Sequence, residues 1–553
     1  MRDKSGLWER GGRGRMNIYL IGMIISMVVF AVIGAVISRK IRNAEDFYVA
    51  GRNAPVILIA GSLIASYSST GMFMGDAAQC YDGAFSSIIL FAGMQSAGYI
   101  LGAVFFGRYL RRSKALTIPE FFGQRFDSKK MRALSAATAM VTMAVYLLSV
   151  MQGVGTLMNA VTGVDYRICI AVCIVVFTLI SVMSGSRGVL ITDTLMAAVF
   201  TVALIIGVLF IAKNSGGWYG ALEQVAASPD TTQVLSWSGK PGVLYDTGWE
   251  NIVWGLNFGV VWMSVCMVGP WQSSRYQMAR DEHTIIRSSY WAAIGVFALE
   301  FLAGIGAVMV RVSVPEMEDS SHVLLWASMN LMPKLLGVLL LTGILAAGIS
   351  SATTFTSLIG ASVANDIFGA SESESDEEDK RYIKIGQWAM ILVAVVILLI
   401  SIFNPPAIFV IMFLGGAVIA SSWMPVAVAC VFCKRLTKTG AFWGMLIGFL
   451  SCFVMKLIVG LGGFSLPAYL DSSIVGIVAN IIAMVIGSAL TQVTEEEKQA
   501  RAAMFVMPER EKDPAEVKRT FASTRLALLI GPLFVVGMAA AWIIPYLRGT
   551  GAL

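Results

Sequence analysis

Long apolar runs separated by short polar segments make up most of the chain. A helix needs about 20 mostly apolar residues to cross the hydrocarbon core of a bilayer. By that measure the pattern predicts about fourteen membrane-spanning helices, and hence an all-α polytopic membrane protein. The expected spans are 17–37, 54–79, 84–110, 133–160, 166–185, 188–212, 251–278, 287–312, 333–367, 383–403, 405–432, 439–461, 472–492 and 524–547.

The composition agrees with burial in a lipid bilayer. Of the 553 residues, 57% are hydrophobic and 14% are charged, and the mean hydropathy is +0.74. Soluble domains carry about a quarter charged residues, so these values exclude a soluble globular protein and a disordered tail. The formal charge of +6 invites a nucleic-acid-binding interpretation. Most of the basic residues, however, lie in short segments between apolar runs, where they orient a membrane protein.

The basic residues favour one end of the expected spans. They are concentrated at 39–52, 108–132, 280–287 and 434–438, whereas 214–250 contains only Lys240. The positive-inside rule places the basic segments in the cytoplasm. Both termini are then expected outside and the charged segment 493–522 inside. We expect a multi-pass protein of the plasma membrane, of the bacterial inner-membrane type.

Residues 1–16 disagree with this orientation. Five basic residues lie between Arg2 and Arg15, which is unusual for a segment outside the membrane. Met16 begins an uninterrupted apolar run. An N-terminal extension ahead of a true start at Met16 explains the charges better than an inverted topology does. The apolar run is also too long for a cleaved signal peptide.

The chain shows no catalytic signature. It lacks the G-x-S-x-G, H-E-x-x-H, P-loop and dinucleotide-binding motifs, and two histidines are too few for a histidine metal centre. Cys430 and Cys433 form a C-x-x-C pair without a second pair, so we interpret them as packing thiols. The acidic run within 371–379 is interpreted as a solvated loop, with a regulatory site as the alternative. We do not expect an enzyme.

Hydroxyl residues gather in the middle of two apolar runs. Residues 61–76 contain Ser66, Ser68, Ser69 and Thr70 between glycines, a pattern that favours an unwound turn whose free carbonyls ligate a cation. In 346–357 the hydroxyl side chains of Ser350, Thr353, Thr354 and Ser357 share one helix face. Hard oxygen ligands suit a small hard cation. Close packing of helices through small residues is the alternative for both segments.

A carboxylate stands just inside a third run. Asp193 follows Thr192 near the start of the span 188–212. Ionisable residues within membrane helices are costly and commonly functional. The alternative is a helix-end partner for Arg187.

Five motifs in order resemble the sodium:solute symporter family. They are Asp-Phe-Tyr-Val-Ala-Gly-Arg at 46–52, Ile-Ala-x-x-x-Ser at 64–69, Leu-Thr-Ile-Pro-Glu-Phe-Phe-Gly-Gln-Arg-Phe at 116–126, Thr-Asp at 192–193 and Ala-Gly-Ile-Ser-Ser at 347–351. The resemblance covers roughly 17–460 and implies a five-plus-five inverted repeat of the leucine-transporter type with broken helices. It places the first peripheral helix at 17–38, the repeats at 54–212 and 251–432, and C-terminal peripheral helices at 439–553. The broken helices would be 54–79 and 251–278.

The resemblance also implies sodium sites. The main site falls on the carbonyls of Ala65, Ser68 and Ala347 and on the hydroxyls of Ser350 and Ser351. A second sodium, used by some members, would fall on Asp193, Ser350, Thr353 and Thr354.

The resemblance identifies the solute less specifically than it does the sodium sites. Positions that are polar in the family's sugar carriers look like Met72, Phe91 and Met94 here, and the aspartate of proline carriers aligns with Tyr67. These departures argue against a sugar and against proline. The stretch 74–83 looks closer to the branch that carries monocarboxylates, vitamins and small anions, and an amino-acid-like solute remains open. Trp262, Trp271, Gln272 and Ser273 are further candidates for the pocket.

The resemblance therefore implies a sodium-coupled symporter that imports a small organic solute. We expect the protein to function as a monomer. A transporter-like membrane sensor that binds solute and acts through a partner protein is the alternative. The segment 493–522 would be its contact with that partner.

Overall fold

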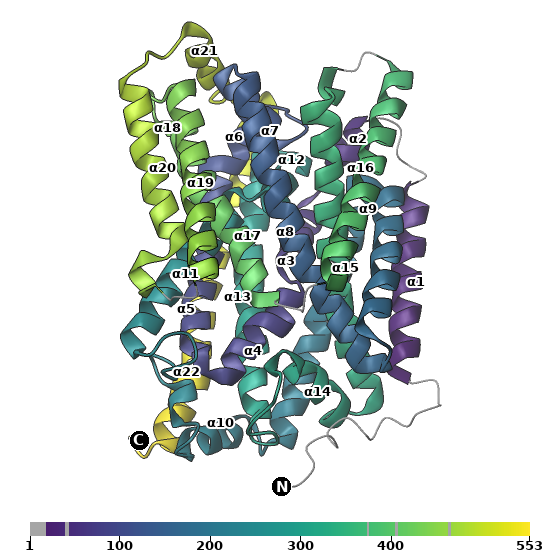
Figure 1. Ribbon diagram of the computed structural model, residues 1–553, viewed down its shortest axis with the longest axis vertical. Coiled ribbons are helices and arrows are strands. Elements are labelled where there is room, and N and C mark those ends of the chain that lie inside the picture. The colour runs from purple at the N-terminus through teal and green to yellow at the C-terminus, as the bar shows by residue number, and fades with distance from the viewer. Residues whose placement is uncertain (1–17, 39–43, 373–374, 404–407, 463–465) are drawn as a thin grey trace.

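The protein is a bundle of long, roughly parallel helices (Figure 1). The computed structural model describes residues 18–38, 44–372, 375–403, 408–462 and 466–553, and no strand is assigned within these ranges. The expected extension 1–16 and part of the acidic run lie outside them. The first half of the chain forms α1 Ile18–Ser38, α2 Ala44–Val49, α3 Val56–Tyr67, α4 Ala77–Gln79, α5 Phe85–Gly102, α6 Arg108–Arg112, α7 Ile118–Phe126, α8 Lys129–Thr162, α9 Tyr166–Asn214 and α10 Trp218–Ala227.

The second half is built in the same way from long apolar helices. Its helices are α11 Gly248–Val268, α12 Pro270–Met278, α13 Glu282–Val310, α14 Val323–Asn330, α15 Lys334–Ser362, α16 Asp376–Phe403, α17 Ile408–Ser422, α18 Met424–Phe432, α19 Lys438–Gly462, α20 Ser472–Ala489, α21 Glu495–Ala503 and α22 Pro514–Gly549. The π-helical segments η3 Gly71–Asp76, η4 Cys80–Ala84, η5 Ala103–Gly107 and η8 Val363–Ile367 continue neighbouring helices.

The expected number of spans is not confirmed. Within the described residues, twelve helical spans are long and apolar enough to cross a membrane. Two of the fourteen expected spans appear instead as the shorter apolar stretches Ile18–Ile33 and Val56–Tyr67. Helix α9 contains two other expected spans, as Tyr166–Met183 and Gly188–Asn214.

The first interruption lies between α3 and η3. Ser68 has an extended backbone, with φ −65° and ψ 107°. The Ser69 hydroxyl accepts a hydrogen bond from the Gly71 backbone N–H at 3.1 Å, and Thr70 donates to the Val150 carbonyl of α8 at 3.1 Å. Serine and threonine side chains that bond to nearby backbone in this way compete with the helical ladder. The helix therefore breaks where the hydroxyl cluster begins.

The second interruption lies between α11 and α12. Gly269 has φ −56° and ψ 138° and precedes Pro270. A residue before proline avoids the helical region, and proline has no N–H to continue the hydrogen-bond ladder. The expectation that 54–79 and 251–278 are broken helices is thus confirmed. Backbone hydrogen bonds from Ala54 N to Met278 O and from Arg280 N to Ala54 O join the ends of these two segments.

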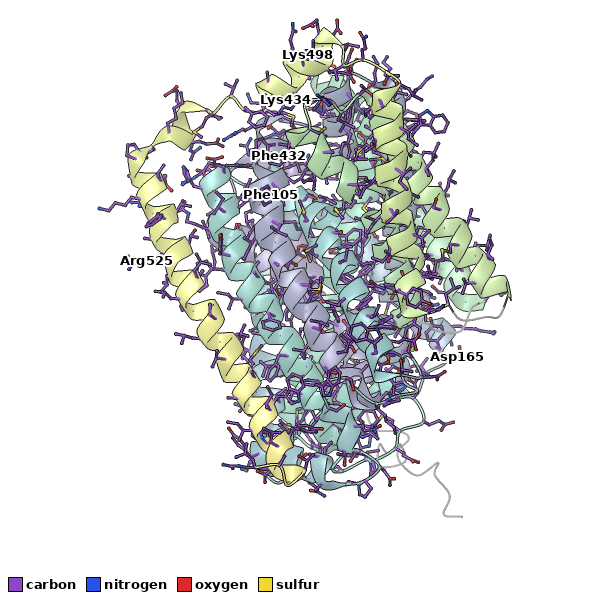
Figure 2. The ribbon with its side chains drawn as sticks, turned by 90° about the vertical axis from the view of Figure 1, so that its left-hand side faces the viewer. Phe105, Asp165, Phe432, Lys434, Lys498 and Arg525 are labelled. Carbon is purple, nitrogen blue, oxygen red and sulfur yellow. The ribbon has the colours of Figure 1, made fainter. Side chains whose placement is uncertain are left out.

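The breaks lie in the centre of the bundle. Helix α3 packs against α9 and α13, α15 packs against α8 and α9, and α11 packs against α5 and α17. Helix α22 crosses the outside of the bundle, where Arg525 points away from it (Figure 2).

The two ends of the bundle carry the segments that the charge pattern assigns to opposite sides. Lys434 and Lys498 lie at one end and Asp165 lies toward the other (Figure 2). Helices α6, α7 and α21 share the first end, whereas α10 and α14 lie at the second (Figure 1). This arrangement agrees with the topology expected from the basic residues.

The segment 493–522 folds back onto the end of the bundle that carries α6 and α7. Arg112 of α6 binds Glu282 at 2.6 Å and Glu511 at 3.0 Å, and all three side chains are at least nine-tenths buried. Arg287 of α13 binds Glu516 at 2.6 Å. Beside them, burial alone would raise the pKa of Asp281, but its hydrogen bonds from Thr284 and Arg280 hold that pKa below its usual value. The segment is therefore bound tightly to its own chain.

Candidate functional site

Asp193 links three helices in the bundle core. Its carboxylate is fully buried. Oδ1 accepts a hydrogen bond from Ser350 of α15 at 2.6 Å. Oδ2 accepts hydrogen bonds from Ser62 of α3 at 2.7 Å and from Arg275 of α12 at 2.7 Å. The carboxylate thus joins the first half of one broken helix to the second half of the other.

Arg275 is the cationic partner of Asp193, in a buried ion pair of 2.7 Å. Its guanidinium also donates to Ser62 at 2.9 Å, to Thr354 at 2.8 Å and to the Trp271 carbonyl at 2.9 Å. An arginine with several such bonds satisfies the donors that burial removes from water. Arg187, the partner considered from the sequence, has its side chain outside the described residues.

The residues of the main sodium site lie close to the first break. Ala65 is in the last turn of α3, where backbone carbonyls lack an intrahelical partner. A Cβ added to Gly348, next to Ala347, would lie 3.3 Å from Thr70 Cγ2, so α15 approaches the break closely. The hydroxyls of Ser68 and Ser351 are buried and have no hydrogen-bond partner among the described residues. Such unsatisfied groups are rare and require an explanation.

The residues of the second sodium site are only partly brought together. Asp193 and Ser350 are hydrogen bonded, and Thr354 joins them through Arg275. The Thr353 hydroxyl donates to carbonyls of its own helix, at Ile349 and Ser350. The Arg275 guanidinium therefore occupies one oxygen of the carboxylate that a second ion would need.

Three of the eight candidate solute residues belong to one aromatic cluster. Tyr67 lies edge-on to Trp262 at 5.7 Å between ring centroids. Tyr146 of α8 contacts Trp262 at 5.9 Å and stacks on Trp271 at 5.4 Å. Phe355 of α15 completes the cluster, 4.8 Å from Tyr146. The cluster fills the space between the two breaks.

The other five candidates lie in three places. Phe91 packs against Phe258 of α11 at 4.6 Å, and Met94 lies against Gly259, where a Cβ would be 2.4 Å from its sulfur. Met72 is buried just beyond the first break. Gln272 and Ser273 lie just beyond the second break. Gln272 accepts a hydrogen bond from Ser66 at 3.1 Å, and Ser273 donates to the Gly269 carbonyl at 2.7 Å.

Two buried donors near the breaks have no acceptor. They are Nε2 of Gln272 and Nε1 of Trp262, which make no hydrogen bond within the described part of the chain. Leaving a buried donor unpaired costs about 1–3 kcal/mol. Both donors can satisfy a bound group that carries acceptor oxygens.

A cavity of about 810 Å³ opens at the expected outer end of the bundle. Its lining includes Trp254 and Phe413. Trp254 stacks on Phe258 at 4.6 Å, and Phe258 in turn contacts Trp262 at 6.2 Å. A row of aromatic rings therefore leads from this cavity to the cluster between the breaks.

Sequence reasoning missed several residues at this centre. Arg275 lies in an expected span, and the rule that selected Asp193 selects it equally. The same rule selects Asp76 and Glu300, which are 2% and 1% exposed. Tyr146 carries no such signal, because an aromatic residue in an apolar run is ordinary. Only the three-dimensional structure shows it between Trp262 and Trp271.

The comparisons with known proteins agree with this arrangement. A family model described as the sodium:solute symporter family matches residues 47–448, well over half of the chain. The chain is 25% identical over 453 residues to the "Uncharacterized symporter YwcA" of Bacillus subtilis (strain 168), covering 79% of this chain and 84% of that protein.

Solved structures show the same fold. A Na+-coupled sialic acid symporter in a substrate-bound outward-open state aligns with a TM-score of 0.72 and 17% identity, over 86% of this chain and 99% of that one. Mhp1, a nucleobase-cation-symport-1 family transporter in a closed conformation, aligns with a TM-score of 0.53 and 13% identity, over 83% and 98%. The fold is the inverted-repeat architecture with broken helices. The chain belongs to the sodium:solute symporter family, as a multi-pass transporter of the plasma membrane and not an enzyme.

Proposed function

We propose that this protein imports a small organic solute together with sodium, functions as a monomer and binds its sodium at the first break. The observation that carries the proposal is the pair of unpartnered hydroxyls, Ser68 and Ser351, on the two sides of the contact between α3 and α15. The ligands are the carbonyls of Ala65, Ser68 and Ala347 with the hydroxyls of Ser350 and Ser351. Oxygen ligands of this kind suit a hard cation such as sodium.

The domain organisation follows the same proposal. Residues 54–212 and 251–432 form the two repeats, and 17–38 and 439–553 form the peripheral helices. Each repeat begins with a broken helix, and such breaks lie at the ion and solute sites of inverted-repeat transporters. Sodium at the break stabilises the outward-open state. Solute binding then closes the outer end, and both ligands leave on the inside.

A second sodium at Asp193, Ser350, Thr353 and Thr354 requires the ion to share the carboxylate with Arg275. Arg275 binds Oδ2 of the carboxylate, whereas Oδ1 accepts a hydrogen bond from Ser350 at 2.6 Å and makes none with the guanidinium. The proposed second ion binds there, and its binding weakens the contact between Asp193 and Arg275.

The solute is proposed to carry a carboxylate, as a monocarboxylate, an amino-acid-like molecule and some vitamins do. The free donors of Trp262 and Gln272 favour an acceptor group. The other residues proposed to line the solute site, Tyr67, Met72 and Trp271, are aromatic or apolar. Phe91 and Met94, which lie behind them, are apolar as well. A sugar would find few partners for its hydroxyls there, and each unpaired hydroxyl would cost free energy.

The alternative is a membrane sensor that binds solute and acts through a partner. It would use the segment 493–522 as the contact surface. In this structure Glu497 and Glu511 of that segment are buried against the protein itself. That intramolecular contact favours the transporter.

The experiment is solute uptake into sealed vesicles that contain the purified protein. Uptake of a candidate monocarboxylate should require a sodium gradient. It should persist when a protonophore is added at fixed sodium and membrane potential. Equal uptake in sodium-free buffer across the pH range would refute sodium coupling. Solute binding without flux would favour the sensor.

A further inference from the structure

Two buried carboxyl groups face each other beside the first break. Asp76 belongs to η3, just after the break, and Glu300 lies in the middle of α13. Their carboxyl groups are within hydrogen-bonding reach of one another. Within the described residues, neither makes an ion pair. This pair is separate from Asp193 and Arg275 and has no part in the sodium sites proposed above.

The described residues around the pair supply no compensating positive charge. Tyr67 of α3 donates to Glu300 Oε2 at 3.0 Å. The other titratable side chains within electrostatic reach are Cys80, Tyr146 and Cys266, all neutral when protonated. If Asp76 and Glu300 were both ionised, the two neighbouring carboxylates would repel each other in a medium of low dielectric constant. One proton shared between them removes that repulsion.

Two polar side chains beside the pair, Gln95 and Asp76, have incomplete hydrogen bonding. The Gln95 side chain of α5 is fully buried and faces Glu300. Neither of its polar atoms makes a hydrogen bond of ordinary geometry within the described residues, and neither does Asp76 Oδ1. A proton on one carboxyl provides the donor that an acceptor oxygen of the pair lacks. No group of three or more His, Cys, Asp or Glu in the described chain is placed to hold a metal, so a proton suits the site better than a multivalent ion.

The pair also connects the two sides of the break. Tyr67 is the last residue of α3, before the break, whereas Asp76 is the last residue of η3, after the break. Both contact Glu300. The proposed sodium ligands Ala65 and Ser68 are on the same short stretch. A change of charge at the pair therefore acts on the sodium site both directly, by Coulomb interaction, and through the geometry of the break.

From this geometry we propose that Asp76 and Glu300 form an intramembrane proton-binding site that holds one shared proton and releases it to water when sodium binds at the break. Electrostatics determines the sign of the coupling between sodium binding and proton binding. A sodium ion nearby disfavours the proton, and loss of the proton leaves a negative charge that favours sodium. Linkage is reciprocal, so raising the pH strengthens sodium binding, by up to about tenfold per pH unit. This proposal rests on the sodium site proposed above.

The test is infrared difference spectroscopy on the purified full-length protein. At neutral pH in choline chloride, the wild type should show the C=O band of a protonated carboxyl group, shifted in heavy water. Adding sodium chloride should reduce that band, and the sodium concentration for half effect should fall as the pH rises. Asp76→Asn and Glu300→Gln should each remove the sodium-sensitive band. Glu318→Gln, at an exposed acidic residue, should leave it unchanged.

Each outcome has a distinct meaning. A missing band in the wild type overturns the shared proton and favours an alkali cation held by two carboxylates. A band that persists in both variants overturns the assignment. A band that sodium does not alter, while sodium still raises the thermal stability of the protein, overturns the linkage alone. If sodium has no effect on the band or on stability at any pH, the proposed sodium site fails with the linkage, and the proton site stands. The wild-type measurement remains decisive if either variant does not fold.

Discussion

Arg275 Nη2 lies 2.7 Å from Asp193 Oδ2, and both side chains are almost completely buried, at 2% and 0% exposed. Arg275 follows the second break in the chain, and Ser62, which also binds Asp193, precedes the first. The ion pair therefore fixes the second half of one broken helix against the first half of the other. A symporter has to move these segments relative to the bundle, so this contact is a candidate for one that changes during transport.

Arg275→Gln should destabilise the protein. The substitution leaves the Asp193 carboxylate buried without a cation, and breaking a buried ion pair in this way costs about 3–5 kcal/mol. Asp193→Asn should also be destabilising, since it leaves the guanidinium unpaired. The double variant Asp193→Asn/Arg275→Gln should recover part of the loss. Thermal unfolding of the purified variants measures all three.

The same variants test the second sodium. If Asp193 binds an ion, the double variant should show a lower Hill slope for sodium than Arg275→Gln alone. Equal sodium dependence in the two proteins would make Asp193 a structural residue and exclude it from the ion sites.

Alanine substitutions at Ser351 and Ser350 should differ in their effect on stability. The Ser351 hydroxyl has no hydrogen-bond partner within the described residues, so Ser351→Ala should not reduce stability in sodium-free buffer. It should weaken sodium binding, because a lost bond to a charged group costs about 1.5–3 kcal/mol, or about one to two decades in affinity. Sodium titration of thermal stability and of solute uptake checks both parts.

Ser350→Ala should behave otherwise. Its hydroxyl donates to Asp193 at 2.6 Å, so its loss should lower stability even without sodium, and should weaken sodium binding more if two ions bind. Unchanged sodium dependence in both alanine variants would remove this helix from the sodium site.

Patterns of local sequence were enough to predict much of the fold. Long apolar runs identified the membrane helices, and a run of serines marked the first break. The family resemblance implied the break within 251–278, but the Gly269-Pro270 step that forms it was not recognised from the sequence. These features depend on a few adjacent residues, because backbone hydrogen bonding in a membrane leaves few alternatives to helix. The number of spans was less secure, since the break at Ser68 leaves α3 too short to count as a membrane span.

The candidate site was harder to predict, because its contacts join residues far apart in the chain. Asp193 was selected correctly as buried and polar, but its partner Arg275 comes from 82 positions away. The spacing of residues gives no indication of that pairing. Asp76 and Glu300 were visible as carboxylates in apolar runs, yet their significance depends on facing each other across two helices.

Arg112→Ala should loosen the C-terminal segment. The substitution leaves Glu282 and Glu511 buried without their shared cation, so a loss of about 3–5 kcal/mol is expected. Lys512→Ala is the matched control, because Lys512 and its partner Glu509 are exposed and such pairs contribute little. Thermal unfolding gives the loss of stability, and limited proteolysis shows whether 493–522 becomes accessible. Equal protection in both variants would contradict a structural role for the Arg112 ion pairs.

Trp262→Phe should weaken the binding of carboxylate solutes while it preserves the aromatic cluster. Phenylalanine keeps a ring beside Tyr67 and Tyr146 but removes the buried Nε1–H, which has no acceptor within the described residues. If that N–H binds the solute carboxylate, its loss costs about 1.5–3 kcal/mol, or about ten- to a hundredfold in affinity. Trp326→Phe is the matched control, because Trp326 on α14 also has a buried Nε1–H without a partner among the described residues but does not belong to the aromatic cluster. Binding of a panel of monocarboxylates and their uncharged amides, measured in sodium, should show a loss for the acids in Trp262→Phe only. An equal loss for acids and amides would mean that the ring and not its N–H contacts the solute. No loss for either would place the solute away from Trp262.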